Sequence, residues 1–223
     1  GTLITHRYVL TSARYTYRFD LVDNMIVRLG DYNINNSSDC IEFAEIGAID
    51  CNSIQEYKVE ENIVHPFYNR FTYTNDISLL RLNQIVEFSN YVRPICLPRS
   101  EDDLAVYGET LFTTGFGEFA DGTKSVIKKK IRTSLISNDE CREKMKLVGV
   151  IIPITPYQIC SVDLPNSTDT TCFRDDGGPV MYSKKSRWFI QGISSTFACG
   201  GGEPQSHLNI YKYLKWIKLN VKE

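Results

Sequence analysis

Short apolar segments, rich in β-branched or aromatic residues, recur along the chain between turn-forming residues. They lie at residues 7–13, 25–29, 57–64, 77–82, 110–114, 126–135 and 188–193. Gly30-Asp31 and His65-Pro66 mark turns that bound them. Many short strands with few helices between them predict an all-β sandwich or pair of barrels rather than a parallel α/β sheet.

Two segments have helical patterns. Ser137-Asn138-Asp139-Glu140 has the S-x-x-E form of a capping box, so a polar helix is expected to run from there to about Leu147. The C-terminal segment has apolar residues at helical spacing: Ile210, Tyr213, Leu214, Ile217 and Val221. The other face of that helix carries Lys212, Lys215 and Lys218.

No internal repeat or low-complexity linker divides the chain. We therefore expect residues 1–223 to form a single domain of two similar lobes, with lobe 1 at about 1–95 and lobe 2 at about 96–223. The chain opens on Gly1-Thr2-Leu3-Ile4, within an apolar segment and without methionine or a signal peptide. This opening indicates a mature or truncated piece whose beginning lies elsewhere.

Composition and charge exclude several classes of function. The 223 residues are 42% hydrophobic and 23% charged, which is typical of a folded globular protein rather than a disordered one. With 25 basic and 27 acidic residues the net charge is −2, so a nucleic-acid partner is not expected. No stretch approaches the run of about 20 apolar residues that a membrane helix needs.

The cysteines indicate an oxidising compartment. There are seven, and none forms the C-x-x-C pairs typical of zinc or redox sites. The odd count predicts three disulfides and one unpaired cysteine, but spacing alone leaves the connectivity open. Glycosylation sequons begin at Asn35, Asn36 and Asn166, which also fits a secreted protein.

The segment Cys172-Phe173-Arg174-Asp175-Asp176-Gly177-Gly178-Pro179 is the most informative. It resembles the C-x-G-D-S-G-G-P nucleophile segment of the trypsin-like (chymotrypsin-fold, S1-type) serine proteases. Other segments resemble that family in the same order: Leu10-Thr11-Ser12-Ala13-Arg14, Asn75-Asp76-Ile77-Ser78-Leu79-Leu80, Pro94-Ile95-Cys96-Leu97-Pro98, Thr114-Gly115-Phe116-Gly117 and Tyr213-Leu214-Lys215-Trp216-Ile217. The resemblance covers almost the whole chain. It implies two six-stranded antiparallel β-barrels, with the first strand lying before Gly1, a short intermediate helix and a C-terminal α-helix.

The resemblance also implies that two of the three catalytic positions have changed. Such proteases activate a serine hydroxyl with a neutral imidazole that a buried carboxylate orients. Here Asp76 keeps the carboxylate, but Arg14 holds the histidine position and Asp176 the serine position. Arginine stays protonated at physiological pH and cannot accept the proton of a nucleophile. We therefore expect no functional catalytic residue and no peptide-bond hydrolysis by the usual route.

Positions around the implied triad differ as well. Arg174 holds the place of an oxyanion-hole glycine, where losing a donor costs on the order of 100- to 1000-fold in rate. Thr170 stands where a trypsin-like enzyme has its pocket-base aspartate. Phe197 and Gln205 fall near glycines of the pocket walls, so their side chains are expected to fill the pocket.

Arg14, Asp76 and Asp176 have two interpretations. They could be unrelated surface charges on a protease-shaped protein. Our hypothesis is instead that Arg14 bridges both carboxylates, because a planar guanidinium suits that geometry. The resemblance places Asp175 at the position of an aspartate that, in active relatives, binds the N-terminal amine exposed by zymogen cleavage. Here it is expected to find Arg174, Arg14 or water, or to stay exposed in a zymogen-like loop.

The resemblance further implies the disulfide pairs. These are Cys40–Cys51, Cys141–Cys160 and Cys172–Cys199, with Cys96 unpaired. A Cys40–Cys51 loop and the segment at 59–66 are similar to arthropod clip-domain proteases and their inactive homologues. In that group the cysteine equivalent to Cys96 bonds an upstream linker, so we expect Cys96 to join this domain to an N-terminal portion.

The remaining candidates favour structural roles. His6, His65 and His207 match no catalytic or metal spacing. Two basic clusters, at 124–132 and 184–187, are interpreted as solvated surface rather than as a heparin or nucleic-acid site. Calcium binding by Asp31, Asp39 and Glu42 is a disfavoured alternative, and no metal or cofactor is expected.

Together these features predict a secreted, non-catalytic serine protease homologue. It would bind proteins, namely proteases or zymogens, and modulate a proteolytic cascade such as arthropod immunity or melanisation. The alternatives are an active S1-type endopeptidase and a module that binds glycans or microbial surfaces.

Overall fold

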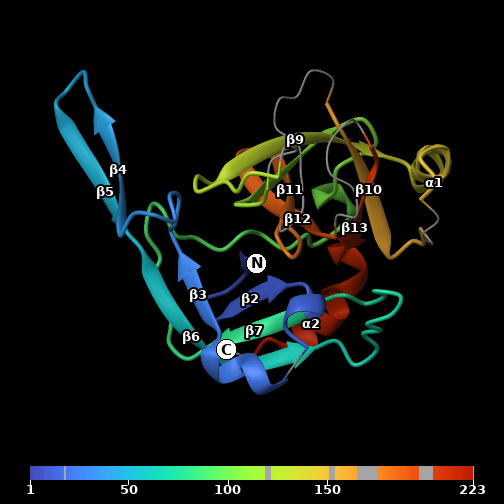
Figure 1. Ribbon diagram of the computed structural model, residues 1–223, viewed down its shortest axis with the longest axis horizontal. Coiled ribbons are helices and arrows are strands. Elements are labelled where there is room, and N and C mark those ends of the chain that lie inside the picture. The colour runs from blue at the N-terminus through green and yellow to red at the C-terminus, as the bar shows by residue number, and fades with distance from the viewer. Residues whose placement is uncertain (18, 119–121, 151–153, 165–174, 196–202, 223) are drawn as a thin grey trace.

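The protein consists of two β-structured lobes packed side by side (Figure 1). This computed structural model describes the chain except residues 18, 119–121, 151–153, 165–174, 196–202 and 223. Strands β1 to β7 lie before residue 83 and strands β8 to β13 after residue 109. The order of elements agrees with the expected trypsin-like architecture.

The first lobe contains an antiparallel sheet of five strands in the order β1-β2-β7-β6-β3. The strands are β1 (Thr2–Leu3), β2 (Tyr8–Thr11), β3 (Ile26–Leu29), β6 (Gln55–Val64) and β7 (Ser78–Leu82). The resemblance implied six strands with the first lying before Gly1, and the described strands form an open sheet of five. The sheet remains open because β1 and β3 pair on one side only, and β1 is just two residues long.

The second lobe is a closed barrel of six antiparallel strands in the order β10-β13-β12-β11-β8-β9. The strands are β8 (Thr110–Gly115), β9 (Lys129–Ile136), β10 (Gln158–Asp163), β11 (Pro179–Lys184), β12 (Arg187–Ser194) and β13 (Gln205–Asn209). Strand β9 starts three residues later than its apolar pattern suggested. Its residues alternate between buried Ile131 and Thr133 and exposed Lys130 and Arg132, the period of two that a barrel wall requires.

Strands β4 (Ser38–Phe43) and β5 (Ala48–Ser53) form a separate two-stranded ribbon. The sequence analysis treated Cys40 and Cys51 as members of a loop, whereas they face each other across this ribbon and form a disulfide. Figure 1 shows the ribbon projecting away from the first lobe. Isolated ribbons are marginally stable in water, so the covalent link contributes to holding this one together.

The C-terminal segment joins the two lobes. A single 3₁₀ turn (Ile210–Tyr213) leads into α2 (Leu214–Asn220), which confirms the expected C-terminal helix. Its buried residues Ile210, Leu214 and Ile217 pack in one apolar cluster with Leu10 and Leu79 of the first lobe and with residues of β12. The lobes therefore share a core, and the surfaces that meet between them are held in place.

Helix α1 (Asn138–Leu147) confirms the capping-box prediction. The backbone N–H of Glu140 donates to Ser137 Oγ at 3.1 Å, and Cys141 and Met145 face the interior.

We expect Ser137→Ala to lower the free energy of unfolding by about 1 kcal/mol, because an N–H at the start of α1 loses its acceptor. Urea denaturation measures this, with Ser183→Ala, at an exposed strand position, as the control. Equal effects of the two substitutions would contradict a capping role for Ser137.

Candidate functional site

Arg14, Asp76 and Asp176 meet where the two lobes face each other. Arg14 lies in a 3₁₀ turn (Ala13–Tyr15) that follows β2, and Asp76 lies just before β7. Asp176 begins the tight turn that leads into β11. Gly177 adopts a φ of +81° in that turn, and a Cβ there would lie 2.7 Å from Thr11 Oγ1, so the turn requires glycine.

Arg14 lies between the two carboxylates. Its Nη2 is 3.3 Å from Asp76 Oδ2, and its Nη1 is 3.7 Å from Asp176 Oδ2. All three side chains are largely buried, with exposed fractions of 16% for Arg14, 2% for Asp76 and 6% for Asp176. The geometry is the carboxylate–guanidinium–carboxylate arrangement hypothesised from the sequence, rather than three separate surface charges.

Asp76 also accepts hydrogen bonds from its neighbours. The backbone N–H of Arg14 donates to Asp76 Oδ1 at 2.6 Å, and the hydroxyl of Ser12 donates to Oδ2 at 2.7 Å. The preceding Asn75 adopts a φ of +54°, and its side chain accepts from the Tyr213 hydroxyl at 3.0 Å. The position of Asp76 is therefore set by the backbone and the shared core as well as by Arg14.

Three further side chains join this cluster, and the sequence analysis did not identify them. The Tyr15 hydroxyl donates to Asp176 Oδ2 at 2.9 Å, and Arg14 Nη2 donates to Ser195 Oγ at 2.8 Å. The Arg14 guanidinium lies 4.7 Å from the ring centroid of Tyr73. Of the three, only Tyr15 could have been singled out from the sequence, because the resemblance implies a cysteine at its position.

The electrostatics of the cluster favour a permanently charged Arg14. Burial lowers the pKa of Arg14, but the charges of Asp76 and Asp176 outweigh this effect and leave the pKa above its usual value. Burial, followed by the charge of Asp176, raises the pKa of Tyr15 to about 12. Neither side chain can therefore act as a proton acceptor near neutral pH.

Asp175 packs against Gly115, the last residue of β8, and against Gly117. Its Oδ1 accepts the backbone N–H of Gly117 at 2.7 Å, and a Cβ on Gly115 or Gly117 would clash with its carboxylate. Asp175 is 5% exposed, so of the alternatives considered, the one in which it stays exposed is wrong. The N–H of Gly117 was not among the expected partners, because a sequence does not show which main-chain donors a turn brings together. Arg174 lies outside the described residues.

Gln205 is the one expected pocket residue that the structure describes. Its side chain is 2% exposed, and its Nε2 donates to Asp163 Oδ1 at 3.2 Å. Among the described residues, Gln205 Oε1 and Asp163 Oδ2 have no hydrogen-bond partner. Thr170 and Phe197 lie outside the described residues.

Burial raises the pKa of Asp163 to about 6, although the hydrogen bond from Gln205 opposes this. When folding raises the pKa of an acid, the folded protein loses stability as the pH increases. The loss runs from the pKa of the unfolded state, near 4, through the pKa of the folded state. We expect Asp163→Asn to increase the free energy of unfolding by about 1–2 kcal/mol at pH 8, since an amide avoids the buried charge and can donate to Gln205 Oε1.

The gain should shrink toward zero at pH 4, where the wild-type side chain is protonated. Urea denaturation at both pH values measures it, with Asp102→Asn at an exposed position as the control. A gain that is equal at pH 4 and pH 8 would contradict the assigned cause.

The structure contains two of the implied disulfides. Cys40 pairs with Cys51 and Cys141 with Cys160, while Cys96 is exposed and free. Cys172 and Cys199 lie outside the described residues, as does Asn166. Asn35 and Asn36 are both exposed.

His207 and Asp39 each have contacts that fit a structural role. Burial lowers the pKa of His207 to about 4, and its Nε2 lies 2.9 Å from Ser161 Oγ. Asp39 accepts from the backbone N–H groups of Tyr32 and Asn33. Within the described ranges, no three His, Cys, Asp or Glu side chains are grouped to hold a metal ion. None of the helices described there is long and apolar enough to cross a membrane.

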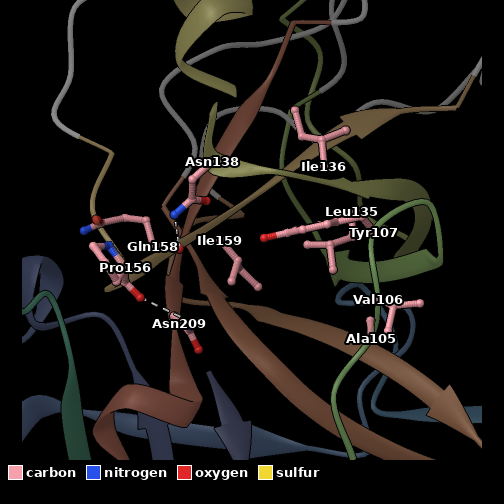
Figure 2. Close-up of a pocket in the computed structure, with 10 residues that line it drawn as sticks. All are labelled: Ala105, Val106, Tyr107, Leu135, Ile136, Asn138, Pro156, Gln158, Ile159 and Asn209. Carbon is pink, nitrogen blue, oxygen red and sulfur yellow. Dashed lines mark hydrogen bonds between the residues drawn. The ribbon is translucent and has the colours of Figure 1, made fainter. Parts of the chain in front are cut away.

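A hollow of about 530 Å³ opens on the second lobe, lined by β9, β10 and neighbouring loops (Figure 2). Leu135 and Ile159 contribute apolar surface, and the side-chain amides of Asn138 and Asn209 donate to backbone carbonyls at its edge. The lining residues are Ala105, Val106, Tyr107, Leu135, Ile136, Asn138, Pro156, Gln158, Ile159 and Asn209. None of these is charged or nucleophilic, so the hollow does not add chemistry to the Arg14 cluster.

The two lobes, the shared core and the position of the Arg14 cluster between them define a trypsin-like domain. The trypsin family model matches residues 1–217 of the chain. The protein belongs to the trypsin family.

Arthropod clip-domain serine proteases are among its curated relatives. The chain is 32% identical to CLIP domain-containing serine protease B9 of Anopheles gambiae, 31% to phenoloxidase-activating factor 1 of Holotrichia diomphalia and 32% to melanization protease 1 of Drosophila melanogaster. Each alignment includes the whole chain and 55%, 61% and 58% of the respective relative. The chain thus spans a little over half the length of these relatives.

Proposed function

We propose that this domain is a non-catalytic serine protease homologue that binds proteins and modulates an extracellular proteolytic cascade. One observation carries the proposal: Arg14 and Asp176, which the family resemblance assigns to the histidine and serine positions of the triad, pair with each other. A protease of this family needs a neutral base to deprotonate a hydroxyl nucleophile. An arginine held between two carboxylates cannot serve as that base, and a carboxylate cannot serve as that hydroxyl.

The relatives suggest the kind of cascade. Two carry names that refer to phenoloxidase activation and melanisation. We infer that the present domain acts in a pathway of this kind, with proteases or zymogens as its partners. The disulfides, which are stable outside the cell, support an extracellular setting.

Labelling with a fluorophosphonate probe tests the proposal, because the reaction requires an activated serine. The purified domain should remain unlabelled and should not cleave chromogenic peptide amides, while an active clip-domain protease treated in parallel is labelled. The competing function is an active S1-type endopeptidase, which membership of the family favours. Turnover that survives removal of contaminating enzymes would establish it and refute our proposal.

A further inference from the structure

The β4–β5 ribbon exposes four large apolar side chains. Ile41, Phe43, Ile46 and Ile49 have exposed fractions of 52%, 46%, 77% and 64%. Within the described part of the chain, the two strands pair only with each other, and the ribbon stands away from the first lobe (Figure 1). Apolar groups gathered in this way on a folded protein mark an interaction surface.

The charge of the ribbon restricts what it can bind. Residues 38–53 contain four acidic side chains and no lysine or arginine. Asp39 lies at the base of the ribbon, where its carboxylate accepts hydrogen bonds from the backbone N–H groups of Tyr32 and Asn33. Glu42 and Glu45 lie toward the tip, beside Phe43 and Ile46, and both are exposed. A partner surface should therefore combine positive charge with apolar or aromatic groups.

The second barrel presents such a surface. Lys130 and Arg132 point outward from β9, and Phe112 of β8 lies directly opposite Arg132. The Lys130 ammonium is 4.7 Å from the ring centroid of Phe112 and 5.0 Å from that of Trp188. We call these four residues the Lys130 face.

Within the described part of the chain, Lys130 and Arg132 form no ion pair. No carboxylate of the described residues lies within 4 Å of Lys130 or Arg132. Trp188 is 37% exposed beside them. The face thus combines the positive charge that the acidic ribbon lacks with exposed aromatic surface.

We propose that the β4–β5 ribbon of one copy docks on the Lys130 face of a second copy. This self-association goes beyond the proposed function and does not depend on it. A sulfated polysaccharide would satisfy the cations of the Lys130 face but leave the apolar ribbon in water, whereas a second copy accounts for both surfaces. Because the two surfaces differ, the contact is heterologous, and it forms chains or rings unless two copies exchange ribbons.

Sedimentation velocity on a Cys96→Ser background measures the association without intermolecular disulfides. We expect the average mass to increase with protein concentration at 0.1 M NaCl. The mass should fall toward that of the monomer at 0.5 M NaCl, since screening shortens the reach of charge pairs, which is about 10 Å at 0.1 M.

Charge reversal on either surface should weaken association at least tenfold. One variant is Glu42→Lys with Glu45→Lys, and the other is Lys130→Glu with Arg132→Glu. Each variant alone should stay monomeric. An equimolar mixture of the two should associate again, because each reversed surface then meets a complementary one on the other variant.

Matched controls reverse the same number of charges elsewhere. Lys215→Glu with Lys218→Glu changes two exposed lysines of α2, and Glu101→Lys with Glu143→Lys changes two exposed acids. Both controls should associate like the parent.

A monomer at all concentrations and salt levels would overturn the proposal. Failure of the mixed variants to associate would also overturn it. Binding of heparin that Lys130→Glu with Arg132→Glu abolishes, without any self-association, would assign the face to a polyanion instead.

Discussion

Replacing Arg14 with methionine is expected to lower the free energy of unfolding by about 2–4 kcal/mol at pH 7. The substitution removes the only cation that ion-pairs with Asp76 or Asp176 among the described residues, and both carboxylates are more than 90% buried. Breaking a buried pair from one side typically costs several kcal/mol, because the remaining charge stays buried. The hydrogen bonds to Asp76 from Ser12 and from the residue 14 N–H remain, which keeps the loss below the upper end of that range.

Thermal and urea denaturation measure the loss, and about 3 kcal/mol corresponds to roughly 6–12 °C in Tm for a chain of this size. The raised pKa of Arg14 keeps the wild type protonated throughout the experiment.

Two control variants separate charge from packing. Arg14→Lys keeps the positive charge and should lose less than Arg14→Met. Arg93→Met removes an exposed arginine that bonds to Asn90 and should cost no more than about 0.5 kcal/mol. An Arg14→Met variant as stable as the wild type would show that the cluster contributes nothing to the fold.

Combining Arg14→His with Asp176→Ser is expected to produce labelling by a fluorophosphonate that neither single variant shows. Asp76 stays in position because Ser12 and the residue 14 N–H hold it, so it can orient an imidazole at position 14. In a triad, loss of the serine or the histidine alone costs on the order of a million-fold in rate, as the subtilisin example shows. We expect the labelling rate of the double variant to exceed that of either single variant at least 100-fold.

Hydrolysis of peptide amides should remain weak in the double variant, because Gln205 stays buried where relatives have a pocket wall. Labelling followed by in-gel fluorescence measures the gain, and Asp76→Asn added to the double variant should reduce it. A double variant no more reactive than the single ones would show that the cleft differs from a working protease in more than these two side chains.

The sequence predicted the fold where local pattern and tertiary packing agree. The start of α1 depends on Ser137 and Glu140 alone, and the structure confirms it. The β4–β5 ribbon was not predicted, although Ile41 and Phe43 alternate with polar residues. Its two strands form a separate sheet, so they lack the run of buried positions by which the other strands were predicted. That the sheet of the first lobe is open could not be predicted from any single strand, because closure depends on which strand edges meet.

The candidate site was also predicted only in part. Residue identity placed Arg14, Asp76 and Asp176 in one cleft through the family resemblance. The contacts of Arg14 with Ser195 and Tyr73 depend on the side-chain conformation, which only the assembled lobes determine. The hydrogen bond from Gly117 to Asp175 was not predicted, since its donor is a main-chain N–H rather than a charged group.

The anchoring of Asp175 by the glycines at the end of β8 has a consequence for how this domain can diverge. Asp175 is secured by main-chain contacts and by the absence of side chains at Gly115 and Gly117. The adjacent position 176 is therefore presented at the same point between the lobes whichever residue occupies it. Because the fold at this position does not depend on the catalytic side chain, a protein with this arrangement can lose catalytic residues and still keep the surface that its partners recognise.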